Sequence, residues 1–157
     1  MSDQNANSGC EPLTLESELS EIARIPPWIE RLAALNAVPE RTRFAMDLCL
    51  EEAVSNVIRH GYAGEPNHAL TVRCEMHRDG FITLVVEDDA LPFNPLLVRE
   101  PPVPASLSDV SVGGQGIHLM KQFADAVEYE RKPAGNRLIL RFFYPGTSPG
   151  LPTVPPS

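Results

Sequence analysis

The sequence has few cysteines, no long apolar run and no excess of basic residues. Its three cysteines, Cys10, Cys49 and Cys74, are widely separated and form no CxxC pair, which argues against a disulfide framework and against a structural zinc site. No stretch approaches the roughly 20 apolar residues of a transmembrane helix. The polar start, MSDQNANSGCEP, lacks the basic and apolar regions of a secretory signal. We therefore expect a cytoplasmic protein.

Acidic residues outnumber basic residues by 21 to 13, which gives a formal net charge of −8. Proteins that bind nucleic acid contact its phosphates with clustered lysines and arginines, so this charge argues against direct nucleic-acid binding. A partner protein with a basic face is easier to accommodate. The length of 157 residues and the hydrophobic content of 43% are typical of one soluble globular domain.

Both ends of the chain lack a pattern that could form a core. Residues 1–12 have no apolar period, and residues 145–157 carry five prolines with little to bury. We predict flexible tails there and a single domain over residues 13–144. Within this domain, residues 91–112 are rich in proline and serine and too long for an ordinary connection, which is typical of a lid.

Apolar spacing predicts the main helices and strands. Residues 39–60 contain no internal glycine or proline and repeat apolar residues every three to four positions, which indicates a long helix, with Gly61 as its C-terminal cap. Residues 69–77 and 81–87 flank a turn at 78–80 and predict a β-hairpin. The other candidates are a strand at 13–15, a helix around 28–35, a helix at 117–124 and strands at 126–131 and 137–144.

Several conspicuous side chains within these predicted helices have ordinary structural interpretations. Trp28 and Cys49 are expected to pack in the core. His60, at the end of the long helix, is interpreted as a cap or packing group rather than a phosphoacceptor.

A carboxylate and an amide share one face of the long helix. Glu52 and Asn56 are four residues apart, so their side chains project one helical turn from each other. An amide oxygen suits Mg²⁺, and a carboxylate can accept a proton from an attacking hydroxyl or water. A solvated helix face is the ordinary interpretation of such a pair. Its position on an otherwise apolar helix favours a functional role.

Three acids end the second strand of the hairpin. Glu87, Asp88 and Asp89 follow the apolar run FITLVV, and the carboxyl end of a strand is a usual place for ligand-binding groups. A buried carboxylate here would accept a hydrogen bond from an adenine amino group. An acidic turn would instead leave the three side chains in solvent. The two alternatives predict different burial.

A glycine cluster, Gly113-Gly114-Gln115-Gly116, precedes the helix predicted at 117–124. Glycines let the backbone approach a phosphate, and a helix start offers unpaired N–H groups and the positive end of a dipole. The cluster matches neither the GxxxxGK[ST] of a P-loop nor a Rossmann fingerprint after an early strand. It predicts a phosphate-binding turn, with a flexible joint as the alternative.

These features follow one another in an order that resembles a known family. The segments are EEAVSNVIRHGY at 51–62, VEDDALPFNP at 86–95 and GGQGIHLM at 113–120. They are similar to the N box and the two glycine boxes of the histidine-kinase-like ATPases, and especially of bacterial anti-sigma-factor serine kinases. The likeness extends from about Leu13 to Tyr144 and includes Tyr129-Glu130-Arg131 and Asn136-Arg137-Leu138. It implies an α+β fold, a two-layer α/β sandwich of the Bergerat type, with helices on one face of a mixed, mainly antiparallel sheet.

The resemblance implies ATP and Mg²⁺ as cofactors and roles for individual residues. Asn56 would bind the Mg²⁺ that bridges the nucleotide phosphates, and Glu52 would be the general base that prepares the attacking hydroxyl. Asp88 would bind the adenine amino group. The lid at 91–112 would close over the phosphates with the freedom of three glycines: Gly113, Gly114 and Gly116.

Two departures from the family pattern concern nucleotide binding. Ala90 stands at a nucleotide-binding position where the first glycine box usually has glycine. If that position needs a positive φ or a very close approach to adenine, the methyl group would cost about 1 kcal/mol, roughly fivefold in affinity. With an ordinary φ and space beside it, alanine would be harmless. The lid also has no arginine immediately before Gly113, and Arg99 is a candidate substitute.

The implied activity is ATP-dependent phosphorylation of a serine or threonine in an anti-sigma-factor antagonist, combined with sequestration of a sigma factor. One alternative is a non-catalytic ATP-binding partner switch that acts by sequestration alone. Another is a subunit that activates a second enzyme by contact. The resemblance also suggests a homodimer.

Overall fold

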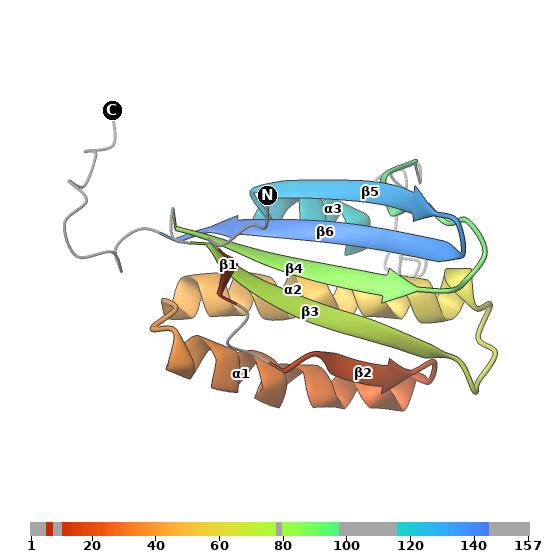
Figure 1. Ribbon diagram of the computed structural model, residues 1–157, viewed down its shortest axis with the longest axis horizontal. Helices are drawn as coiled ribbons and strands as arrows, with labels where there is room; N and C mark the ends of the chain where they lie inside the picture. The colour runs from red at the N-terminus through yellow and green to blue at the C-terminus, as the bar shows by residue number, and fades with distance from the viewer. Residues whose placement is uncertain (1–5, 8–10, 78–79, 98–115, 145–157) are drawn as a thin grey trace, which may run out of the picture.

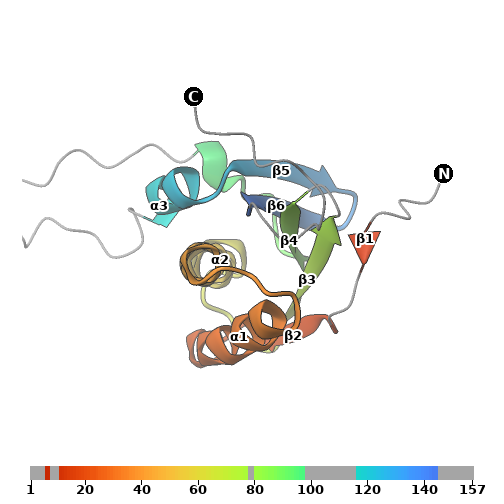
Figure 2. The ribbon, with the colours of Figure 1, turned by 90° about the vertical axis from the view of Figure 1, so that its left-hand side faces the viewer.

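The computed structural model describes residues 6–7, 11–77, 80–97 and 116–144. These residues form two layers, an antiparallel sheet and three α-helices that lie together on one of its faces (Figures 1 and 2). The strands are β1 (Ala6–Asn7), β2 (Leu13–Glu16), β3 (Ala69–His77), β4 (Phe81–Asp88), β5 (Ala126–Lys132) and β6 (Gly135–Phe143). The helices are α1 (Ile25–Leu35), α2 (Glu40–Asn56) and α3 (Gly116–Phe123), with 3₁₀ turns at Leu19–Arg24 and Pro95–Leu97. The predicted α+β, two-layer class is confirmed.

The sheet has the strand order β1-β3-β4-β6-β5, and β2 also pairs with β3. Every pairing between the described strands is antiparallel. The predicted hairpin is confirmed, because β3 and β4 pair along their length. The last strand, β6, lies between β4 and β5, and its register places Asn136 opposite Asp88. The start of β6 therefore lies beside the acidic end of β4.

The core lies between the sheet and α2. Val72, Val86 and Leu138 are aligned across β3, β4 and β6 and are all buried beneath the helix layer. The pleat of a strand sends successive side chains to opposite faces, so their neighbours along each strand face away from the helices. Met46 and Leu50 of α2 are fully buried on the helix side. Helix α2 lies between α1 and α3 and contacts both β4 and β6, which brings its C-terminal end near the end of β4 (Figure 2).

The long helix ends differently from the prediction. Helix α2 gives way at Val57 to a π-helical turn, Val57–Gly61, in which the Tyr62 N–H bonds to the Val57 carbonyl at 2.9 Å. Gly61 does not have a positive φ, so its prediction as a capping glycine is wrong. Gly64 has a φ of 77° and donates its N–H to the Ile58 carbonyl at 2.9 Å. Ala63, with a φ of 53°, and Gly64 therefore take the left-handed conformation that ends the helix.

The apolar face predicted for the long helix is confirmed toward its C-terminus but not at its start. Phe44 is 56% exposed and makes an edge contact with Phe123 of α3. Trp28 and Cys49 are buried as predicted, and burial raises the pKa of the Cys49 thiol to about 12. None of the described helices is long and apolar enough to cross a bilayer.

Candidate active site

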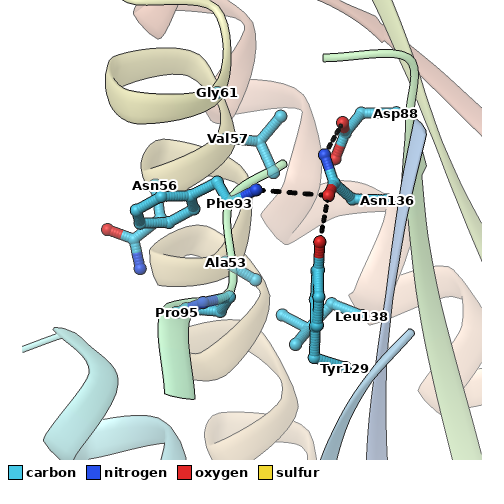
Figure 3. Close-up of a pocket in the computed structure, with 10 residues that line it drawn as sticks. All are labelled: Ala53, Asn56, Val57, Gly61, Asp88, Phe93, Pro95, Tyr129, Asn136 and Leu138. Atoms are coloured by element: carbon cyan, nitrogen blue, oxygen red, sulfur yellow. Dashed lines mark hydrogen bonds between the residues drawn. The ribbon is translucent and has the colours of Figure 1, made fainter. Parts of the chain in front are cut away.

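A pocket lies between the end of α2, the segment after β4 and the strands β5 and β6 (Figure 3). The residues that line it are Ala53, Asn56, Val57, Gly61, Asp88, Phe93, Pro95, Tyr129, Asn136 and Leu138. The structure thus brings together Asn56 and Asp88, which the sequence singled out in separate motifs. Figure 3 shows Asn56 on the helix side and Asp88 beside Asn136 on the sheet side. Apolar side chains fill much of the wall between these two polar ends.

Glu52 and Asn56 lie one turn apart on α2, but only Asn56 lines the pocket. Asn56 is 3% exposed, whereas Glu52 is partly exposed beside the pocket residue Ala53. Among the residues that the structure describes, Asn56 Nδ2 is buried without a hydrogen-bond partner. A buried amide normally bonds at both ends, since an unpaired polar group costs about 1–3 kcal/mol. Asn56 therefore has an unmet binding capacity at the pocket.

The side chain of Asn56 has the chemistry of a magnesium ligand. The oxygen and nitrogen of an asparagine amide are assigned from their hydrogen bonds, so a side chain whose Nδ2 has no partner among the described residues can present either atom. Its oxygen is a hard ligand of the kind that Mg²⁺ accepts beside waters and substrate phosphates. The chemistry of this residue therefore agrees with the role that the resemblance implies, and that role is taken up as a proposal below.

The three acids at the end of β4 have three different environments. Glu87 bonds to cations on neighbouring strands, and Asp89 accepts a hydrogen bond from the Tyr62 hydroxyl at 2.5 Å. Asp88 lines the pocket and accepts hydrogen bonds from Asn136 and from the Ala90 N–H. Only Asp88 of this trio faces the pocket, which favours the ligand-binding alternative over a solvated acidic turn.

Glu87 is a structural ion-pair centre. Its carboxylate contacts Arg73 Nε at 3.0 Å, Lys132 Nζ at 2.9 Å and Arg137 at 3.4 Å. Burial alone would raise the pKa of Glu87, but the hydrogen bonds from Lys132 and Arg73 and the charges of Arg73 and Arg137 lower it to about 2. Because the folded pKa lies below the ordinary value of 4.5, this stabilisation is present above that value and is lost as the pH falls to about 2.

We expect Glu87→Gln to lower the free energy of unfolding by about 1–2 kcal/mol at neutral pH, since it removes three partly exposed ion pairs. Urea unfolding of the wild type and the variant would measure the difference. The two proteins should converge in stability as the pH is lowered toward the pKa of Glu87. A difference that persists undiminished in acid would contradict the assignment of the stabilisation to this carboxylate.

The electrostatics of Asp88 differ from those of Glu87. Burial raises the pKa of the Asp88 carboxyl, while the hydrogen bonds from Asn136 and the Ala90 N–H oppose this change. The charge of Asp89 raises the pKa further, and that of Arg131 lowers it. The site therefore holds a partly desolvated carboxylate with fixed hydrogen-bond donors on one side.

Asn136 is a pocket residue to which the sequence assigned no role. It is 5% exposed and lies opposite Asp88 in the register of β4 and β6. Its amide bonds to Asp88 and to the peptide groups that follow β4, and it accepts a hydrogen bond from the Tyr129 hydroxyl (Figure 3). The resemblance covered the segment around Asn136, but only the strand register shows that it meets Asp88.

Ala90, the departure from the first glycine box, has an ordinary backbone conformation. Its φ is not positive, and its side chain is 6% exposed without lining the pocket. A Cβ placed on Gly61 would approach the Ala90 Cβ to 3.1 Å. The backbone of Ala90 is held by its N–H bond to Asp88 at 2.9 Å and by the bond from Arg131 to its carbonyl at 3.0 Å. The methyl of Ala90 therefore occupies space left by Gly61.

We expect Gly61→Ala to weaken binding of ATP, the ligand that the resemblance implies, about fivefold, because the new methyl would displace Ala90 and, with it, Asp88. Adding Ala90→Gly should remove this clash and restore affinity, so the effects of the two changes should be non-additive. ATP titration of the wild type, both single variants and the double variant would measure the coupling. Additive effects would show that the two side chains do not share this space.

The remaining predicted site residues lie largely outside the described residues. Gly113, Gly114, Arg99 and most of the lid at 91–112 belong to this part of the chain. Gly116 is described as the first residue of α3, so the glycine cluster does precede a helix as predicted.

Two aromatic contacts support the rim of the pocket. The ring of His60 stacks on Phe93 with centroids 5.1 Å apart, which confirms its interpretation as a packing group. The ring of Tyr62 stacks on His68 at 4.6 Å while its hydroxyl bonds to Asp89. The His60–Phe93 contact and the Tyr62–Asp89 hydrogen bond join the segment after α2 to the segment after β4, whereas His68 lies just before β3. They fix the relative positions of the two polypeptide stretches that carry Asn56 and Asp88.

The two-layer sandwich, with a pocket at the end of α2 that holds a buried asparagine and a half-buried carboxylate, has the architecture of an ATP-binding domain. Residues 15–142 match the family model described as the histidine kinase-like ATPase domain. The chain belongs to this family.

Relatives of the chain include a serine/threonine-protein kinase and an anti-sigma factor. It is 30% identical over 114 residues to the serine/threonine-protein kinase BtrW of Bordetella bronchiseptica, covering 72% of this chain and 79% of the relative. It is 23% identical over 111 residues to the anti-sigma F factor of Priestia megaterium, covering 71% and 68%. The fold is similar to the crystal structure of the RsbU and RsbW domains of Rv1364c from Mycobacterium tuberculosis, with a TM-score of 0.56 at 13% identity over 85% of this chain and 32% of that chain.

Proposed function

We propose that the protein is an ATP-dependent serine/threonine protein kinase and anti-sigma factor of a partner-switching system. The observation that carries the proposal is that Asn56 and Asp88 line one pocket from its helix side and its sheet side, in the order of the family motifs. The similarity to a serine/threonine-protein kinase and to anti-sigma F factors supports the same activity. In this proposal the sheet end of the pocket binds the adenine, and phosphate transfer takes place at the helix end.

The sheet end of the pocket would hold the adenine. The Asp88 carboxylate is a hydrogen-bond acceptor for the exocyclic amino group, and Leu138 and Val57 offer apolar surface to the faces of the base. Ala90 would support this end through its contact with Asp88. Partial burial of the carboxylate would strengthen such a bond, because the local dielectric constant is lower than that of water.

The helix end of the pocket would hold the phosphates. Asn56 would bind Mg²⁺, which when bound neutralises the phosphate charge and orients the γ-phosphate for transfer. Glu52, one turn earlier, would accept the proton of the incoming serine or threonine hydroxyl. Gly113, Gly114 and Gly116 would let the lid at 91–112 close over the phosphates, with Arg99 as a candidate phosphate contact. Most of the rate enhancement would come from positioning these groups.

The proposed partners are an anti-sigma-factor antagonist, which supplies the phosphoacceptor serine or threonine, and a sigma factor, which the protein sequesters. Both act in transcription regulation, so we place the protein in the cytoplasm. A homodimer is part of the proposal, on the strength of the family resemblance. The domain boundaries at 13 and 144, with tails on either side, also remain predictions.

A non-catalytic partner switch is the competing function. The observation that favours it is Ala90 in the first glycine box, although the backbone at this position accepts alanine. In such a switch ATP would be a structural ligand, and sequestration alone would be the output.

Incubation of the protein with Mg·ATP and its antagonist distinguishes the two functions. A mass gain of one phosphate on the antagonist supports the kinase. A stable complex with unmodified antagonist supports the switch. An antagonist encoded beside this gene is the first partner to test.

A further inference from the structure

The pocket contains a buried amide, Asn136, that bonds directly to the residue proposed to recognise adenine. Its Nδ2 donates to Asp88 Oδ1 at 2.8 Å and to the Leu91 carbonyl at 3.0 Å. Its Oδ1 accepts from the Phe93 N–H at 3.3 Å and from the Tyr129 hydroxyl. The amide therefore bonds to side chains and backbone from three different segments of the chain.

These partners fix the orientation of the Asn136 amide. A backbone N–H can only donate, so Phe93 requires the oxygen of Asn136 on its side. The Leu91 carbonyl can only accept, so it requires the nitrogen. A flipped amide would lose both bonds, which means that the NH₂ group must face Asp88.

The orientation has a consequence for the Asp88 carboxylate. The bonds that it accepts within the described ranges, from Asn136 at 2.8 Å and from the Ala90 N–H at 2.9 Å, both fall on Oδ1. Figure 3 shows the first of these bonds. Two donors on one oxygen prevent free rotation of the carboxylate about its terminal bond. The second oxygen, Oδ2, is left for a ligand of the pocket that Asp88 lines.

We propose that Asn136 is a positioning residue that sets the base selectivity of the pocket. It holds Asp88 by one oxygen, so that the other is presented as a hydrogen-bond acceptor for the amino group at C6 of adenine. Hypoxanthine carries a carbonyl oxygen at C6, and this oxygen would meet the carboxylate as a second acceptor. The pocket therefore selects adenine over 6-oxopurines by repulsion as well as by attraction. This inference rests on the proposed nucleotide function and names the residue that makes it specific.

The test compares the affinities for ATP and for ITP, both with Mg²⁺, in four full-length proteins. Asn136→Leu replaces the amide by an apolar group of similar size, and Tyr129→Phe removes only the hydroxyl that holds the Asn136 oxygen. Leu140→Ala is the matched control, because Leu140 is fully buried on the same strand, β6, but makes no contact that positions Asp88. Thermal unfolding of each protein reports the cost to the fold.

We expect the wild type to prefer ATP and Asn136→Leu to reduce the ATP-to-ITP affinity ratio about tenfold, the loss expected for a hydrogen bond to a charged group. Tyr129→Phe should reduce the ratio by a smaller factor. Leu140→Ala should lower the unfolding temperature and leave the ratio unchanged. A role of Asn136 in the fold alone would weaken both nucleotides equally.

An unchanged ratio in folded Asn136→Leu overturns the inference, and Tyr129→Phe decides in the same way if the first variant does not fold. A wild type that binds neither nucleotide contradicts the proposed function itself. A wild type that prefers ATP, with variants that keep the same preference, contradicts only the role of Asn136.

Discussion

We expect Glu52→Gln to retain ATP binding but to lose phosphate transfer by about 10²–10⁴-fold, the contribution of a general base. Glu52 does not line the pocket, so a glutamine of the same size should leave the pocket walls in place. It lies one turn from Asn56, on the helix that would present it to a hydroxyl approaching the phosphates. Transfer would be measured as phosphate incorporation into the antagonist, and affinity by titration with Mg·ATP.

The matched control for Glu52 is the neighbouring carboxylate Glu51. Burial and the charges of Asp47 and Glu52 raise the pKa of Glu51, so it shares a charged, partly buried environment with Glu52. Its side chain leaves the helix in a different direction, since successive helical residues are rotated by about 100°. Glu51→Gln should therefore retain transfer. Full activity of Glu52→Gln, or an equal loss in both variants, would remove Glu52 from the mechanism.

The second large effect is expected at Asn56. Asn56→Ala should lower the affinity for ATP in the presence of Mg²⁺ by about 10–100-fold, comparable to the loss of groups that support a bound metal. The titration repeated without Mg²⁺ should show no difference between variant and wild type. This loss of affinity should not be accompanied by a comparable loss of stability, measured as the unfolding temperature. The substitution removes a buried Nδ2 that has no partner among the described residues.

Two further variants separate metal binding from general damage to the pocket. Asn56→Asp restores an oxygen ligand and should recover part of the Mg²⁺ dependence. Asp88→Asn should weaken ATP binding with or without Mg²⁺, since it acts at the base. Wild-type affinity in Asn56→Ala with Mg²⁺ present would contradict the metal site.

The features predicted correctly from the sequence depend on neighbouring residues. The 3.6-residue period of α2 and the alternation of β3 and β4 around a short turn are local patterns, and the structure confirms both. Asn56 and Asp88 line one pocket because their motifs lie at the ends of these local elements, and their roles there remain predictions. Glu52 remained at the edge of this pocket, where helical spacing alone places it.

The features that were missed depend on contacts between distant residues. Asn136 meets Asp88 only through the register of β4 and β6, which no local pattern reports. The space between Gly61 and Ala90 likewise exists only after the end of α2 packs against the segment after β4. The capping error at Gly61 has a local cause, since a π-helical turn extends the helix and the left-handed conformation falls on Ala63 and Gly64. The exposure of Phe44 reflects its contact with Phe123 on α3 rather than with the sheet.

The pairing of Asp88 with Asn136 also determines when the site can exist during synthesis. The ribosome delivers α2 and β4 well before β6, so an emerging chain has the acidic strand end without the amide that orients it. Such a chain would lack the amide that makes the pocket selective for adenine. Selective binding of ATP would therefore begin only after β6 has been added to the sheet, so that ATP would stabilise the finished fold rather than guide its assembly.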